Sequence, residues 1–191
     1  MEHLHIKEVI HGNISPSNIF ISIRDGRQGD HIYLSYYFFF KKKYVYNCIF
    51  PIFLGPFLKL RNFGFNKVVL KVEGKAPLVW KEQVFNLEWA APEVHRDYGE
   101  PTYFLDVFAL GLTFGFTLIG QHLFGITKSE QIDKIKNCQT MIPKAEQLLL
   151  RVGKEALDLV KSMLVSLASQ RPRAKQILKH RYFQIQTKES G

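Results

Sequence analysis

Polar residues that could do chemistry gather in one short loop near the start of this 191-residue chain. The loop reads His11-Gly12-Asn13-Ile14-Ser15-Pro16-Ser17-Asn18, which offers one imidazole, two amides and two hydroxyls. An amide cannot act as a general base, because it carries no charge and has no accessible protonated form. Amide oxygens are also weak ligands for Mg²⁺, which is usually bound through carboxylates and phosphates. The loop therefore lacks the carboxylates that proton abstraction or magnesium binding would require.

Extended segments follow the loop. Pro16 prevents a helix from running through the loop, since proline has no N–H and disfavours helical geometry in the residue before it. Ile19–Ile23 alternates as a short strand, and the turn residues of Asp25–Gly29 predict a hairpin. Two segments could form the returning strand, His31–Leu34 and Phe57–Arg61, and the sequence leaves both open.

Helical patterns dominate the rest of the chain. The run Tyr103–Ile119 is apolar nearly all round, which is typical of a helix buried on every side. Met1–Glu8 predicts the end of another helix, and three amphipathic patterns predict helices over Lys128–Asn137, Lys154–Ser166 and Arg173–Tyr182. We therefore expect an α+β fold that is mainly helical, with a small β-hairpin near the loop.

Short motifs follow one another along the chain in a fixed order. They are the loop 11–18, Asn62-Phe63-Gly64, Ala91-Pro92-Glu93, Asp106 with Phe108 and Gly111, and Gln170-Arg171-Pro172 followed by Ile177-Leu178-Lys179-His180. In the same order they resemble the H-R-D-L-K-P-x-N, D-F-G, A-P-E and D-x-W-x-x-G motifs and the closing segment of protein kinases. The resemblance implies the C-terminal lobe of the kinase fold. It covers no G-x-G-x-x-G loop or V-A-I-K strand, so the N-terminal lobe that roofs the nucleotide is expected to be missing.

Three phrases narrow the resemblance. They are Pro101-Thr102-Tyr103, the segment 120–125 and the segment 171–175. All three resemble the sensor kinases of the unfolded-protein response and their relative ribonuclease L. Those proteins continue into a ribonuclease domain, whereas only a few polar residues follow Phe183 here, so we infer no ribonuclease activity.

The family's catalytic positions are changed in this chain. The resemblance places Asn13 where the catalytic base stands, Ser15 where a lysine steadies the phosphoryl group, and Asn62 where an aspartate holds Mg²⁺. Asn18 stands at the position of the family's second metal ligand, and it would be a vestigial residue of the cofactor site. A hydrogen bond from Asn18 to nearby backbone is the favoured interpretation. The resemblance therefore implies a pseudokinase with no intact catalytic residue, no bound metal and no expected cofactor.

Other family positions are kept and have structural roles in the family. His11 would orient the loop rather than act as a base, and Phe63-Gly64 would form a hydrophobic plug and a turn. By the same resemblance, Glu93 would pair with Arg171, and Asp106 would hold the backbone of the loop. The sequence retains the scaffold and loses the chemistry.

One block does not fit the family pattern. Residues 1–183 are expected to form the partial kinase-like domain and 184–191 a polar tail, with an apolar insertion at 34–57. Joining Tyr33 to Leu58 would restore a conventional hairpin return. The block is rich in Phe, Tyr, Lys and Ile, which are residues with A/T-rich codons, so our hypothesis is that it is a retained intron translated in frame. The alternative is a genuine insertion that exposes an apolar surface.

Charge, cysteine content and hydropathy bear on the partners and the cellular compartment of the protein. The chain has 26 Lys and Arg against 17 Asp and Glu, for a net charge of +9, but such charge runs are typical of solvated surfaces, so no nucleic-acid partner is expected. Cys48 and Cys138 are isolated, which suggests a reduced, intracellular and cytoplasmic setting. The apolar run after Lys43 is too short and too broken by prolines to span a membrane.

Three readings of function remain open. The first is a catalytically inactive lobe that acts as a binding or regulatory module. Such a lobe would bind a protein partner or form a kinase-like dimer. The second is a part of a serine/threonine kinase or kinase/endoribonuclease sensor that binds ATP and Mg²⁺ when an upstream lobe completes it. The third is a truncated product without a function.

Overall fold

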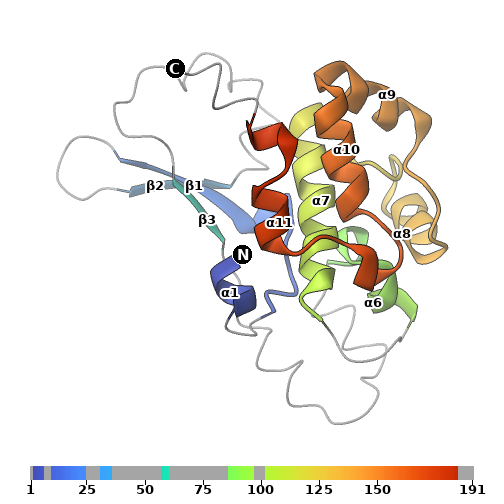
Figure 1. Cartoon of the computed structure of the whole chain (residues 1–191), viewed down its shortest axis with the longest axis horizontal. Helices are drawn as coiled ribbons and strands as arrows, with labels where there is room; N and C mark the ends of the chain where they lie inside the picture. Colours follow the sequence, from blue (N-terminus) through green and yellow to red (C-terminus); the bar gives the residue numbers. More distant parts are fainter. Residues whose placement is uncertain are drawn as a thin grey trace, which may run out of the picture.

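The protein folds into a group of helices with a small sheet at one side, as Figure 1 shows. The structure is a computed structural model, and it describes residues 2–6, 10–24, 31–35, 57–60, 86–96 and 102–184. The Asn62-Phe63-Gly64 motif, most of the 34–57 block and all of the predicted tail except Gln184 lie outside these residues. The predicted mainly helical α+β class is confirmed.

The sheet has three antiparallel strands in the order β2-β1-β3. The strands are β1 (Ile19–Arg24), β2 (His31–Ser35) and β3 (Phe57–Leu60). Ile21 of β1 faces Leu34 on one side and Leu58 on the other, so both candidates for the returning strand pair with β1. Leu34 and Phe57 belong to strands, which places the two ends of the predicted 34–57 insertion inside the sheet.

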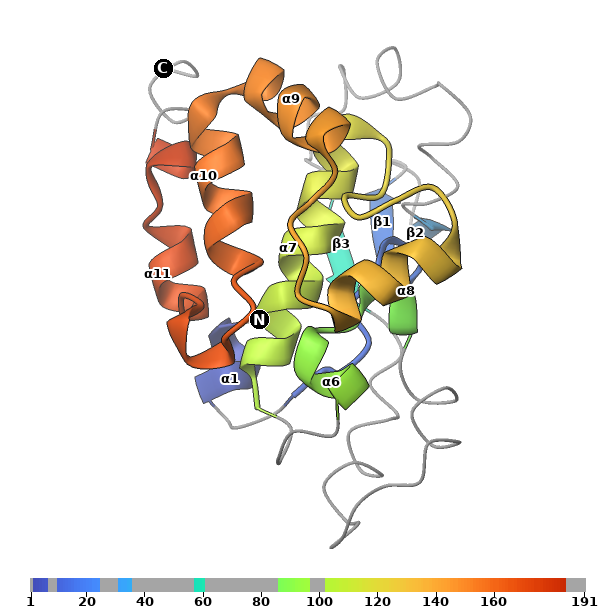
Figure 2. The ribbon, with the colours of Figure 1, turned by 90° about the vertical axis from the view of Figure 1, so that its right-hand side faces the viewer.

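The centre of the helical part is α7 (Phe104–Ile119), which lies among the other helices in Figure 2. Nine of its 16 residues are buried, as its apolar sequence predicts. The helix ends at Gly120, whose φ of 72° is the left-handed conformation that glycine adopts without strain. At Gly111 an added Cβ would lie 2.8 Å from Cβ of Met163, so the absence of a side chain allows α7 to pack closely against α10 (Lys154–Met163).

The remaining helices differ in part from the prediction. The structure contains α1 (Glu2–Ile6), α6 (Pro92–Arg96), α8 (Lys128–Lys136), α9 (Pro143–Val152), α10 (Lys154–Met163) and α11 (Ala174–Leu178). Helix α9 was not predicted from the sequence, although Pro143 at its first turn and the buried Ala145 and Leu149 fit a helix. The predicted helix Arg173–Tyr182 is wrong in its extent, because α11 ends at Leu178.

Two clusters of side chains form the core. In one, Phe108 and Leu112 of α7 pack with residues of the α7–α8 connection, α8, α9 and α10. In the other, Val107 packs with Leu159, Met163 and Ile177, so α7, α10 and α11 share an apolar contact. Within the described part of the chain, no helix is long and apolar enough to cross a membrane.

Candidate functional site

The loop 11–18 is held in place by Asp106, which lies in the first turn of α7 and is completely buried. Its Oδ2 accepts a hydrogen bond from the backbone N–H of His11, and its Oδ1 accepts one from the backbone N–H of Gly12, both at 2.8 Å. The Nε2 atom of His5 in α1 lies 3.3 Å from the same Oδ2. One carboxylate therefore joins α1, the loop and α7. The loop contacts are those that the family resemblance implied, whereas the role of His5 was missed.

His11 is fully buried and bonded within the loop. Its Nδ1 accepts a hydrogen bond from the backbone N–H of Asn13 at 3.2 Å, which requires Nδ1 to be unprotonated. The side chain therefore orients the loop rather than facing solvent, as the structural interpretation predicts.

Asn18 and Ser15 are used inside the loop as well. The Nδ2 atom of Asn18 donates to the carbonyl of Asn13 at 2.8 Å, which is the backbone role favoured for it from the sequence. Ser15 is buried, and its Oγ lies 2.9 Å from Oγ of the exposed Ser17. A hydroxyl paired with a hydroxyl supplies no positive charge at this position.

Asn13 is the residue of the loop whose side chain is not engaged. Its Oδ1 is buried and has no hydrogen-bond partner. Asn13 lines a small hollow of ≈ 10 Å³ together with Asn86, Trp89 and Leu105. This volume has room for about one water molecule. A buried amide oxygen without a hydrogen-bond partner is costly to the fold.

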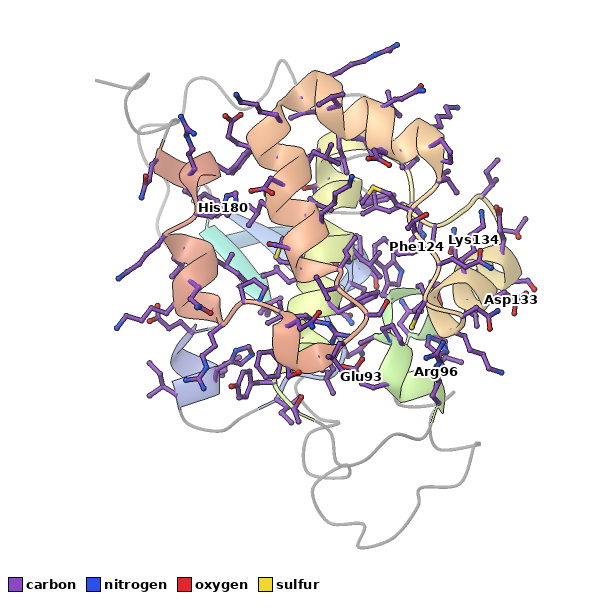
Figure 3. The ribbon with its side chains drawn as sticks, turned by 45° about the vertical axis from the view of Figure 1, so that its right-hand side comes forward. Glu93, Arg96, Phe124, Asp133, Lys134 and His180 are labelled. Atoms are coloured by element: carbon purple, nitrogen blue, oxygen red, sulfur yellow. The ribbon has the colours of Figure 1, made fainter. Side chains whose placement is uncertain are left out.

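A second polar cluster lies near the same N-terminal end of α7, between Glu93 and Arg171. Glu93 comes from α6, beside the segment that follows α10 (Figure 3). The two side chains form a bidentate ion pair, with Nη1 of Arg171 2.7 Å from Oε1 of Glu93 and Nη2 2.8 Å from Oε2. The same guanidinium donates to the carbonyls of Val165, Phe104 and Ser166. This pair was expected from the resemblance, and it fixes α6 to the start of α7 and to the segment after α10.

The positions that would bind metal in the family are only partly within the described residues. Asn62, Phe63 and Gly64 lie outside the described residues, so their distance from Asn13 and Asn18 is not defined. Among the residues that the structure does describe, no group of three or more His, Cys, Asp or Glu side chains could hold a metal ion. The described site thus consists of a folded loop, its anchor Asp106 and the hollow beside Asn13.

His122 supports the wall of this site and was not singled out from the sequence. Its ring packs edge-on against Trp89, with the centroids 4.8 Å apart, and Trp89 lines the hollow beside Asn13. Nε2 lies 2.8 Å from the carbonyl of Glu88, and Nδ1 accepts the N–H of Phe124 at 3.2 Å. Burial lowers the pKa of His122 from 6.5 to about 4, while the contacts to Glu88 oppose part of this shift.

This neutral histidine predicts that acid destabilises the fold. The unfolded chain takes up a proton on His122 near pH 6.5, whereas the folded chain does so only near pH 4. The stabilising contribution is therefore complete above pH 6.5 and is lost as the pH falls to 4, with a total of about 3 kcal/mol. Urea unfolding between pH 7 and pH 4 should show a steeper loss for the wild type than for His122→Phe. Equal slopes for the two proteins would contradict the assignment.

Comparison with known proteins agrees with this arrangement. Residues 1–183 match the family model described as "Protein kinase domain". The chain is 27% identical over 192 residues to the human protein "Serine/threonine-protein kinase/endoribonuclease IRE2", covering 99% of this chain and 18% of that protein. The chain therefore spans less than a fifth of this relative.

Among solved structures, the fold is similar to the "Twitchin kinase region from C.elegans (Fn31-NL-kin-CRD-Ig26)". The TM-score is 0.58 at 20% sequence identity, and the match covers 95% of this chain and 26% of that one. At this identity the likeness supports the fold alone. The family match, the structural match and the anchored loop together show that this chain belongs to the protein kinase family, with a C-terminal lobe similar to that of the kinase/endoribonucleases.

Proposed function

We propose that this lobe does not transfer phosphate and acts instead as a binding or regulatory module. The observation that carries the proposal is the state of the loop, which is folded and anchored but presents an amide at position 13. Among the described residues, the carboxylate that contacts the loop is Asp106, and both of its oxygens already accept backbone N–H groups. A group used in this way is not free to take a proton from a substrate hydroxyl.

The other two replaced positions, Ser15 and Asn62, would affect how the transferred phosphoryl group is stabilised. Kinase chemistry depends on placing cations around the transferred phosphoryl group. Ser15 is a buried hydroxyl bonded to Ser17, so it adds no charge, and Asn62 in place of aspartate weakens the magnesium site. One lost electrostatic contact of this kind commonly costs about 3 kcal/mol of transition-state stabilisation. Three changes at positions that act together leave no mechanism for useful phosphotransfer.

A phosphotransfer assay tests this proposal directly. Purified chain, radiolabelled ATP, Mg²⁺ and a generic protein acceptor should give no incorporation above a blank without protein. Asn13→Ala serves as the diagnostic variant, and Asn137→Ala, at an exposed position after α8, serves as its matched control. Incorporation by the wild type and Asn137→Ala that disappears in Asn13→Ala would disprove the proposal, whereas a trace equal in all three proteins would come from a contaminant.

A second candidate function is nucleotide binding without catalysis, and the likeness to a kinase/endoribonuclease favours it. Thermal unfolding with and without ATP and Mg²⁺ separates it from the first. A ligand at a hundred times its Kd stabilises the native state by about 2.7 kcal/mol, which raises the Tm by several degrees in a protein of this size. An unchanged Tm at saturating nucleotide would exclude the second candidate for this chain.

A further inference from the structure

The charges of the described residues are separated along the chain. The described positions from 86 to 158 carry 7 Lys and Arg against 8 Asp and Glu, which nearly balance. Residues 159–184 carry 6 Lys and Arg and no acidic residue at all. The excess of positive charge is therefore not spread evenly over the helical part. Part of it is concentrated in residues 159–184, at the end of the kinase-like lobe.

Two of these six cations are already used by the fold. Arg171 is buried in its pair with Glu93, and Lys161 pairs with Glu146. The other four are exposed and form no ion pair within the described residues. They are Arg173 directly before α11, Lys175 within it, and Lys179 and Arg181 after it, and we call the four together the α11 basic face.

This face lies on the outer side of the molecule. Ala174 and Ile177 are buried, and Ile177 packs against Val107 and Met163, so the opposite side of α11 points away from the core. Leu178, between Lys175 and Lys179 on this outer side, is 59% exposed. Figure 2 shows α11 at the edge of the helical group, with α10 on one side and α1 at its lower end.

Two acidic residues of neighbouring elements lie near the face. Asp158 of α10 has a side chain that is 78% exposed, and its Oδ2 lies 3.1 Å from Nε2 of His180. Glu2 of α1, which contacts α11, is half-buried. Within residues 173–181, four exposed cations accompany the exposed Leu178, and they outnumber these two acidic side chains.

We propose that the α11 basic face docks on an anionic membrane surface. Clusters of four or more Lys and Arg are attracted to leaflets rich in phosphatidylserine, and the exposed Leu178 can enter the boundary between headgroups and acyl chains. The chemistry fits other polyanions less well. Single-stranded nucleic acid is held by stacking on exposed aromatic rings, whereas Tyr182 and Phe183 pack on Phe114 in the second core cluster. Stable protein interfaces are depleted of lysine and need a larger apolar centre than one leucine.

Vesicle sedimentation with the full chain tests the docking. We expect the protein to sediment with vesicles of phosphatidylcholine and phosphatidylserine, but not with vesicles of phosphatidylcholine alone. Binding should fall as sodium chloride is added, because salt screens exposed charges. Each basic side chain near the surface contributes about fivefold to the partition, and because these factors multiply, removing all four should reduce it about 600-fold. The test variant is Arg173→Gln, Lys175→Gln, Lys179→Gln and Arg181→Gln.

A matched variant separates this face from the overall charge. It removes the same number of positive charges from exposed positions on α8, α9 and α10, and it consists of Lys136→Gln, Lys144→Gln, Arg151→Gln and Lys154→Gln. It should keep most of the binding. Both variants should retain the wild-type Tm, because the residues are exposed.

Three results would overturn the proposal. The first is no sedimentation of the wild type with phosphatidylserine vesicles. The second is an equal loss in the two variants, which would assign the binding to the overall charge. The third is preferential capture of the wild type by soluble polyglutamate, lost with the α11 basic face, which would assign the face to an acidic protein.

Discussion

Replacing Arg171 with alanine should lower the free energy of unfolding by about 3–5 kcal/mol, the range found when one partner of a buried ion pair is removed. The guanidinium side chain is fully buried and forms a fork with the carboxylate of Glu93. It also lies over the ring of Phe108, 4.9 Å from its centroid. The substitution leaves the Glu93 carboxylate, which is itself only 19% exposed, without its cation.

The loss extends beyond the ion pair. The carbonyls of Val165, Ser166 and Phe104 all accept hydrogen bonds from Arg171 and would need new donors. Lysine cannot replace this geometry, because an ammonium group lacks the planar fork that reaches several acceptors at once. We therefore expect Arg171→Lys to be destabilising as well, although less than Arg171→Ala.

Urea unfolding followed by circular dichroism measures these changes. Arg173→Ala is the matched control, because it removes an exposed arginine two positions away and should change the free energy of unfolding by less than about 0.5 kcal/mol. Adding Glu93→Gln to Arg171→Ala should recover part of the loss, since it removes the stranded charge. If the Arg171→Ala and Arg173→Ala variants were equally stable, the pair would not hold the fold together.

The helices that were predicted well are those whose sequence pattern records their environment. The apolar run of α7 reports burial on all sides, and nine of its residues are indeed buried. The amphipathic pattern of α8 likewise predicted its start at Lys128, where Thr127 caps the helix by accepting the N–H of Glu130. Local sequence was sufficient in both cases.

Other features depend on contacts that local sequence does not record. Both candidates for the returning strand looked equivalent, and the structure pairs both with β1, because a central strand has two edges. The extent of α11 was overestimated, since the chain turns at His180 to bring Tyr182 onto Phe114.

In the candidate site, too, some residues could be predicted from the sequence and others depend on contacts between distant parts of the chain. Motif spacing led to Asp106, Glu93 and Arg171 through the family resemblance, and the structure brings each of them to its expected partner. His5 and His122 were missed as supports of the site because their partners lie far along the chain, at Asp106 and Glu88. Nothing in the residues beside either histidine indicates these contacts.

Replacing Asp106 with asparagine should release the loop 11–18 from α7 and lower the free energy of unfolding by about 3 kcal/mol. The carboxylate accepts one backbone N–H on each oxygen, from His11 and from Gly12. Asparagine offers one oxygen and one NH₂ group, so one of these buried N–H groups would face another donor. Gly12 also has a φ of 73°, and the bond to Asp106 helps to hold this conformation.

Amide hydrogen exchange distinguishes release of the loop from general destabilisation. In Asp106→Asn the amides of His11 and Gly12 should lose protection first, while the amides of α10 should exchange only through global unfolding. Asp133→Asn is the matched control, because Asp133 is exposed on the outer side of α8 (Figure 3) and the same substitution there should leave all of these amides protected. If the two loop amides kept their protection in Asp106→Asn, the loop would be held by other contacts. Loss of protection at the loop alone would instead show that the carboxylate of Asp106 is what holds the loop against α7.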